Sequence, residues 1–113
     1  MRLIKHSNWV EGEEYKKRVL LDNFGKQINL IEDVIVAVGG KIPLHGHDFT
    51  DEIFYITKNS LVMMVDKEKF EVSEGDMIYV EKNENHGFEN KSNKESKMIV
   101  MKINFKKGDS FLN

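Results

Sequence analysis

Three histidines and one glutamate are the residues of this sequence best suited to bind a metal ion. His45 and His47 form a His-x-His pair, Glu52 follows five residues after the second histidine, and His86 lies far downstream. Imidazole nitrogens combined with one carboxylate suit a divalent transition metal, so the candidate ions are Mn, Fe, Ni, Zn, Co and Cu. A His-x-His pair alone is a weak signal. Its value here depends on the elements that bring the four side chains together.

Alternation along extended chain predicts how these side chains can meet. His45 and His47 are two residues apart, so on a strand both point to the same face. We expect strands over residues 44–47, 51–57 and 86–89. If these three strands are neighbours, three imidazoles and one carboxylate converge on a common interior.

The same alternation predicts an apolar wall beside the metal ligands. Glu52 shares a strand face with Phe54 and Ile56, and His86 shares one with Phe88. A polar end with an apolar wall is a common design for a small-molecule site. The expected interior side chains are Phe54, Ile56, Met63, Met77, Phe88 and Met101. We interpret the methionines as core residues rather than as soft metal ligands.

Short apolar runs separated by turn residues dominate the rest of the chain. They recur about every 8–12 residues, which is typical of an all-β sandwich or barrel. The expected strands fall within residues 19–21, 28–38, 52–57, 61–65, 69–72, 77–80 and 97–105, with a tight hairpin at 66–68. Residues 11–18 have helical composition and predict one or two helical turns. Residues 90–97 and 106–113 are polar and predict loops.

Length, charge and composition limit the classes of function. The chain has 113 residues, no cysteine and a net charge of −2 from 17 basic and 19 acidic residues spread along its length. One domain is expected, with neither disulfides nor thiolate metal sites. Balanced charge argues against nucleic acid and membrane surfaces as partners. The first ten residues lack the apolar stretch of a signal peptide, and no run reaches the roughly 20 residues of a membrane span, so we expect a cytoplasmic protein.

Two segments resemble the conserved motifs of the cupin superfamily. The first motif is a Gly, five residues, His-x-His, three or four residues, a Glu, six residues and a Gly, and here it reads Gly39, His45, His47, Glu52 and Asn59. The second is a Gly, five residues, Pro-x-Gly, two residues, a His, three residues and an Asn, and here it reads Gly75, Glu81, Asn83, His86 and Asn90. Order, residue types and spacing agree in both segments.

The resemblance implies a fold and a ligand set. It implies a double-stranded β-helix, the jelly-roll barrel of small RmlC-like cupins, in one domain over residues 1–113: an arm at 1–17, the barrel at 18–105 and a tail at 106–113. It also implies that one metal is bound by His45, His47, Glu52 and His86. Small cupins commonly form homodimers, and we expect the contact region at Trp9 and residues 18–22.

Three departures from the motifs affect the prediction. Asn59 and Asn83 stand where the motifs have glycine, and asparagine tolerates left-handed backbone better than most residues. Glu81 replaces the motif proline, which removes no ligand. Asp51 adjoins Glu52 and is the alternative carboxylate ligand. We favour Glu52 because it directly precedes an Ile-Phe-Tyr run, as the family's glutamate typically does.

Two functions of different class remain open. The first is a metal-dependent enzyme of dioxygenase or isomerase type that acts on a small oxygenated metabolite, with the metal as Lewis acid or oxygen site. The second is a cupin that binds a small molecule or a metal without turnover, as a sensor or accessory protein. A metal-free cupin and a nucleotide-sugar epimerase fit less well, since diphosphate sites favour arginine and the chain has only Arg2 and Arg18. We interpret Lys16 and Lys17 as part of a solvated face.

Overall fold

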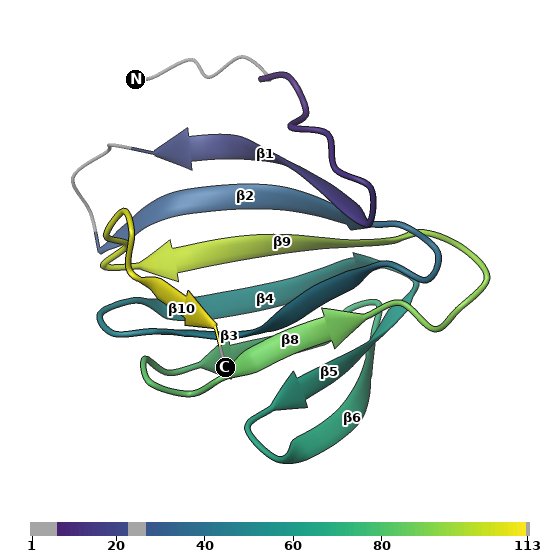
Figure 1. The fold of residues 1–113 in the computed structure, drawn as a ribbon. Coiled ribbons are helices and arrows are strands. Elements are labelled where there is room, and N and C mark those ends of the chain that lie inside the picture. Colours follow the sequence, from purple (N-terminus) through teal and green to yellow (C-terminus); the bar gives the residue numbers. More distant parts are fainter. Residues whose placement is uncertain (1–6, 23–26, 113) are drawn as a thin grey trace.

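The computed structural model describes residues 7–22 and 27–112, and every regular element within them is a β-strand (Figure 1). The ten strands are β1 (Tyr15–Asp22), β2 (Ile28–Val36), β3 (Lys41–His47), β4 (Asp51–Lys58), β5 (Ser60–Val65), β6 (Glu68–Ser73), β7 (Met77–Val80), β8 (His86–Glu89), β9 (Ser96–Ile103) and β10 (Ser110–Leu112). No helix in this part of the chain is long and apolar enough to cross a membrane.

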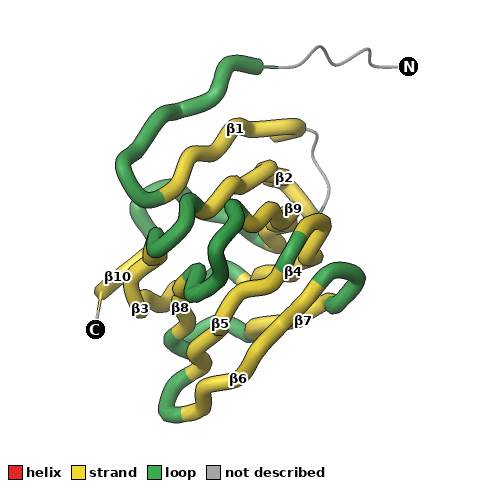
Figure 2. The backbone as a smooth tube through the Cα atoms, turned by 90° about the vertical axis from the view of Figure 1, so that its right-hand side faces the viewer, coloured by secondary structure: helices red, strands yellow, loops and turns green. Residues whose placement is uncertain are grey.

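The strands form two antiparallel sheets of five. One has the order β1-β2-β9-β4-β7 and the other β10-β3-β8-β5-β6. Figure 2 shows the two layers from the side. The chain crosses between the layers repeatedly, for example from β2 to β3 and from β3 to β4, which is the connectivity of a jelly roll. The strands over 44–47 and 86–89 are hydrogen-bonded neighbours as expected, whereas the strand over 51–57 lies in the opposite sheet.

The core lies between the sheets and follows the period-two pattern in most strands. Phe54, Ile56, Met63 and Phe88 are at most 3% exposed, as predicted. Burying a side chain of this size contributes about 1.5–3 kcal/mol. The prediction for Met77 was wrong. Ile78 and Val80 are the residues of β7 that face inward, so Met77 faces outward and is 61% exposed. Met101 is also not a core residue, since the inward positions of β9 include Met98, Val100 and Lys102.

Two turns depend on asparagine in the left-handed backbone region. Asn59 has φ 64° and Asn83 has φ 70°, so the prediction that asparagine can replace the motif glycines is confirmed. The hairpin predicted at 66–68 is also present, with Val65 paired to Glu68 across a two-residue turn. This hairpin is tied to the segment before β8 because the Asp66 amide donates to the Asn85 carbonyl at 2.8 Å.

Two predictions near the ends of the chain were wrong. The residues of helical composition lead into an extended strand, β1, whose Lys17 also bridges to Val10. The polar tail is not entirely loop, because β10 adds to β3 with Ser110 opposite His47. Tertiary pairing overrides local propensity in both places.

Candidate metal centre and its pocket

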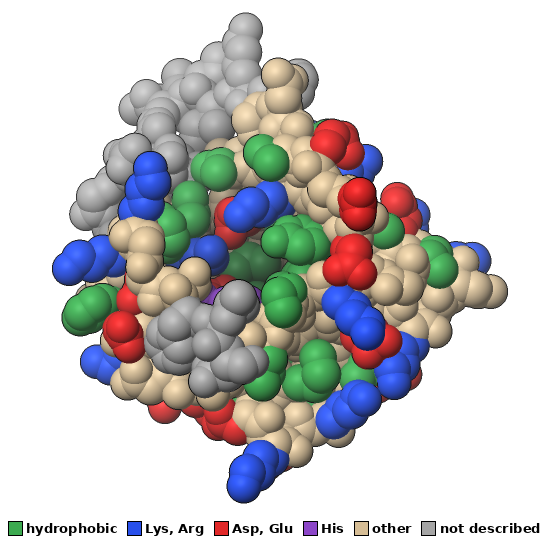
Figure 3. All heavy atoms as spheres, in the orientation of Figure 1, with side chains coloured by type: hydrophobic (Ala, Val, Ile, Leu, Met, Phe, Trp, Pro, Cys, Tyr) green, Lys and Arg blue, Asp and Glu red, His purple; other side chains and the backbone are tan. Residues whose placement is uncertain are grey.

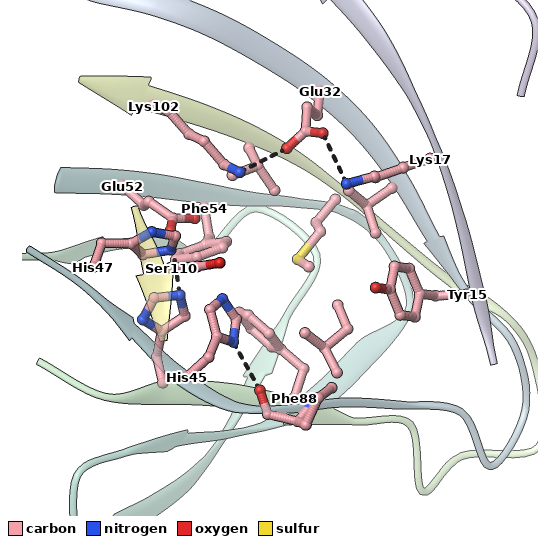
Figure 4. Close-up of a pocket in the computed structure, with 16 residues that line it drawn as sticks. Tyr15, Lys17, Glu32, His45, His47, Glu52, Phe54, Phe88, Lys102 and Ser110 are labelled. Carbon is pink, nitrogen blue, oxygen red and sulfur yellow. Dashed lines mark hydrogen bonds and ion pairs between the residues drawn. The ribbon is translucent and has the colours of Figure 1, made fainter. Parts of the chain in front are cut away.

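The four predicted ligand residues come together at one end of the space between the sheets. His45 and His47 lie on β3, His86 lies on the neighbouring β8, and Glu52 faces them from β4 of the other sheet. One nitrogen or oxygen atom from each of the four lies within 4.8 Å of the others. The two sheets therefore share one candidate metal centre (Figure 4).

A bulge in β3 sets the direction of His45. Ile42 pairs with Phe88 and His45 pairs with His86, so two residues of β3 lie opposite the single residue Gly87. Bulges of this kind re-aim side chains, and they tolerate the proline at position 43. A β-carbon at Gly87 would lie only 2.8 Å from the Ile42 carbonyl oxygen, so the close approach requires glycine.

The bulge also supplies a hydrogen bond that orients the first imidazole. Nδ1 of His45 lies 2.7 Å from the Pro43 carbonyl oxygen, which can only accept, so Nδ1 carries the proton. Nε2 of His45 is thereby left deprotonated and available to a metal. A backbone carbonyl behind the ligating imidazole is the usual outer support of a histidine metal ligand.

Several polar atoms of the cluster are buried without a good hydrogen bond. Nδ1 of His47 is one of them, and the three that face one another are Nε2 of His47, Nε2 of His86 and Oε1 of Glu52. Oε1 of Glu52 is in contact with Nε2 of His47 and lies 3.4 Å from Nε2 of His86. Burying polar atoms without partners costs free energy. A cation bound among them would satisfy all three at once, so the donor set fits a transition metal.

The ionisation of the cluster favours metal-competent forms. Burial lowers the pKa of His45, which keeps its imidazole neutral. Burial acting alone would raise the pKa of Glu52, but the imidazoles of His47 and His86 and the charge of Lys102 outweigh it and hold that pKa well below its usual range. A neutral imidazole and an ionised carboxylate are the forms that coordinate a metal.

Asp51, the alternative carboxylate, lies outside the cluster. Its side chain accepts a hydrogen bond from the Tyr79 hydroxyl at 2.9 Å and another from the Lys82 amide at 2.7 Å. Both bonds lie on the exposed side of the strand. The geometry therefore favours Glu52 over Asp51.

Asp109 supports the cluster from the segment before β10. Its carboxylate accepts hydrogen bonds from the backbone amides of Asp48, Phe49 and Thr50 at 2.9–3.2 Å, and from the Thr50 hydroxyl at 2.7 Å. These three residues form the loop between His47 and Glu52. No local pattern identifies Asp109, because it belongs to a polar segment about 60 residues away from the loop that it holds.

A cavity of about 250 Å³ adjoins the candidate metal centre. Its wall is apolar, as predicted, and includes Phe54 and Phe88. Figure 3 shows the hollow in the surface, with hydrophobic side chains at its bottom, a histidine at its edge and lysine and acidic side chains beside it. The other polar residues that line it are Tyr15, Lys17, Glu32, Lys102 and Ser110. Lys17 lines this cavity while its side chain stays 44% exposed, so it is solvated as expected but also belongs to the site.

Comparisons with known proteins agree with this architecture. A family model described as the cupin domain matches residues 32–102. The chain is 41% identical over 69 residues to an uncharacterized protein of Methanocaldococcus jannaschii, a match that covers 61% of this chain and 55% of the relative. The chain thus spans little more than half the length of that relative.

Solved structures share the fold at low sequence identity. KdgF from Halomonas sp. has a TM-score of 0.79 at 18% identity, covering 89% of both chains. A predicted oxalate decarboxylase from Thermotoga maritima has a TM-score of 0.81 at 19% identity, covering 92% of this chain and 100% of the other. At such identities the likeness shows the fold alone. It confirms the predicted all-β, double-stranded β-helix.

Proposed function

Because this chain belongs to the cupin family, we propose that it is a metal-dependent enzyme that acts on a small oxygenated metabolite. His45, His47, Glu52 and His86 hold one divalent transition metal in this proposal. The observation that carries it is the set of buried, unsatisfied nitrogen and oxygen atoms that these side chains direct at one another. Structural zinc sites are usually closed by four ligands, and several of them are cysteine thiolates, which this chain lacks.

The cavity favours an enzyme over a protein that only stores metal. Four protein ligands would not saturate a six-coordinate ion, and a metal held by these residues would supply Lewis-acid or oxygen chemistry. The candidate ligands themselves line the cavity, and the Tyr15 hydroxyl points into it (Figure 4). Apolar side chains of the wall exclude water from the reacting groups. Of the two reaction classes, we favour isomerisation, because the Tyr15 hydroxyl provides a group that can carry a proton in the same cavity.

The first test is the metal content of untagged protein purified without chelators. We expect about one equivalent of a transition metal by inductively coupled plasma mass spectrometry, and loss of that metal in a His45→Ala/His86→Ala variant. Reconstitution with Co²⁺ then separates the two function classes. A visible spectrum that changes when a chelating hydroxy acid is added supports open coordination positions and an enzyme. An unchanged spectrum contradicts the enzyme and favours a non-catalytic binding protein.

We also propose that the chain forms a homodimer. Within the described residues β1 is the edge strand of its sheet, and its outer side makes one bridge, from Lys17 to Val10. The Arg18 guanidinium lies over the Trp9 ring, 4.3 Å from the ring centre, so the partly exposed Trp9 is held beside that edge. Light scattering at micromolar concentration tests this proposal, and a monodisperse monomer would contradict it.

A further inference from the structure

Three charged residues occupy inward-facing positions on three adjacent strands. Glu32 of β2 is 5% exposed and lies between Lys17 of β1 and Lys102 of β9. The carboxylate oxygens lie 3.5 Å from Nζ of Lys17 and 3.1 Å from Nζ of Lys102. All three side chains line the same cavity as the histidines, on the side away from His45 and Phe88 (Figure 4). We call them the Lys-Glu-Lys group.

The Lys-Glu-Lys group contains more positive charge than Glu32 needs. One lysine neutralises the carboxylate, and the second leaves one surplus cation. The Lys102 side chain is only 15% exposed, so its charge is poorly hydrated. Partly buried charges are costly unless an opposite charge compensates them. Without a metal, the charge of Glu52 provides that compensation; if Glu52 bound a metal, an anion in the cavity would take its place.

The total charge of the residues that line the cavity also favours an anionic ligand. Lys17 and Lys102 contribute two positive charges, and Glu32 and Glu52 contribute two negative charges, so the lining is neutral without metal. A divalent metal at the candidate centre raises the total to +2. A ligand with two negative charges therefore matches the loaded cavity. The charge of Lys102 already acts across this space, since it contributes to lowering the pKa of Glu52.

We propose that the Lys-Glu-Lys group is an anion-binding subsite, and that the ligand is a small dianionic organic acid. One end carries the oxygens that bind the metal, and the other carries a carboxylate or phosphate that binds Lys102 and Lys17. Glu32 holds the two ammonium groups in place. This inference rests on the proposed metal centre. The cavity of about 250 Å³ is smaller than the roughly 300–1,000 Å³ of typical ligand pockets, so it limits the ligand to a few carbons.

Matched ligand pairs test the proposal by calorimetric titration of the Mn²⁺-loaded protein. Malate and lactate share a 2-hydroxy acid end, and only malate carries a second carboxylate. Likewise 3-phosphoglycerate differs from glycerate by a phosphate, which adds about 1.5–2 negative charges. We expect the member with the second anionic group in at least one pair to bind about tenfold or more tightly than its partner, which is the usual effect of a charge-assisted hydrogen bond. The pair that shows the difference identifies whether the second group is a carboxylate or a phosphate.

Lysine variants test whether the Lys-Glu-Lys group causes the preference for the ligand with the second anionic group. We expect Lys102→Met to abolish that preference while the affinity for lactate or glycerate stays unchanged. Lys17→Met should reduce the preference less, because the Lys17 side chain is 44% exposed. Lys102→Arg should retain it. Lys97→Met is the matched control, since Lys97 lies on the same strand but does not line the cavity. If Lys102→Met fails to fold, as judged by circular dichroism, the Lys17→Met titration decides.

The failures of the subsite and of the metal centre are distinguishable. Wild-type protein that takes up Mn²⁺ but binds malate and lactate equally, and 3-phosphoglycerate and glycerate equally, overturns the subsite and leaves the metal centre standing. The same holds if the preference survives in both lysine variants. Protein that takes up no metal overturns both proposals.

Discussion

Oδ2 of Asp109 lies 3.8 Å from Nδ1 of His47, on the side of the imidazole opposite the candidate metal position. This distance is too long for a hydrogen bond, so the carboxylate acts on the imidazole through its charge alone. The same carboxylate holds the backbone of residues 48–50, which connects His47 to Glu52. Asp109 is therefore a positioning residue for two of the four candidate ligands.

Replacing Asp109 should weaken metal binding. We expect Asp109→Asn to lower the affinity for Co²⁺ by about 10–100-fold, the usual cost of losing an outer partner of a metal ligand. Competition against a chromogenic chelator measures the change. Asp48→Asn, an exposed carboxylate in the same loop, is the matched control and should bind normally. Wild-type affinity in Asp109→Asn would remove Asp109 from the support of the site.

Neighbouring carboxylates provide a second matched pair. Glu52→Gln should reduce metal affinity by more than the roughly 10–100-fold typical of an outer partner, because it removes the one negative charge of the ligand set. Asp51→Asn should retain the affinity, since its oxygens bond to Tyr79 and Lys82. Metal content after dialysis distinguishes the two variants. The reverse result would make Asp51 the ligand.

Metal affinity should decrease as the pH falls, because the cluster contains histidines. Histidine coordinates only when neutral, and burial lowers the pKa of His45 from its ordinary value of 6.5. Affinity should therefore be high above pH 6.5 and fall as the pH decreases through the lowered pKa. Titrations from pH 8 to 5 measure this, and a flat profile would exclude the histidine site.

The metal-free protein should lose stability over the same range. The folded-state pKa values of His45 and Glu52 both lie below their ordinary values, so the unfolded chain binds more protons than the folded chain as the pH falls. The free energy of unfolding should therefore be highest above pH 6.5. It should decrease below pH 6.5 because of His45, and decrease further below pH 4.5 because of Glu52. Urea unfolding at several pH values measures the decrease. His45→Gln, which lacks the titrating imidazole, should flatten the upper part of the profile.

Two substitutions of Asn83 should affect the stability of the fold differently. Asn83 has φ 70°, and its backbone amide donates a hydrogen bond to the His47 carbonyl oxygen at 2.7 Å. Asn83→Ala should cost about 1 kcal/mol of unfolding free energy, because alanine lacks the short polar side chain that lets asparagine adopt the left-handed region. Asn83→Gly should be nearly neutral. Denaturant midpoints compare the two, and equal stability of the variants would show that the turn does not need this conformation.

The sequence predicted that His45, His47, Glu52 and His86 cluster beside an apolar wall, and the alternation of polar and apolar residues identified much of that wall. Glu52, Phe54 and Ile56 are the clearest example. The same reasoning failed for Met77, which lies in a run of four apolar residues that offers no alternation to fix its face. Pairing between distant segments, such as Asp109 with the loop at residues 48–50, leaves no local pattern at all.

The sequence contains one signal for the Lys-Glu-Lys group, a glutamate within an apolar stripe. Leu30, Glu32, Val34 and Val36 share one face of β2. A glutamate in that apolar stripe contradicts burial unless cations neutralise it. The partners of Glu32 lie on separate strands, so the sequence alone could identify the anomaly but not Lys17 and Lys102.

The interior of the barrel has two regions with different tolerance for evolutionary change. One contains close-packed side chains that do not line the cavity, such as Ile56, Leu61 and Met63, where a single substitution costs much of the total stability. The other is the cavity rim, where Tyr15 and Lys17 are partly exposed and can be exchanged at small cost. Descendants of one gene can therefore acquire new ligands by altering the rim while the β-helix persists.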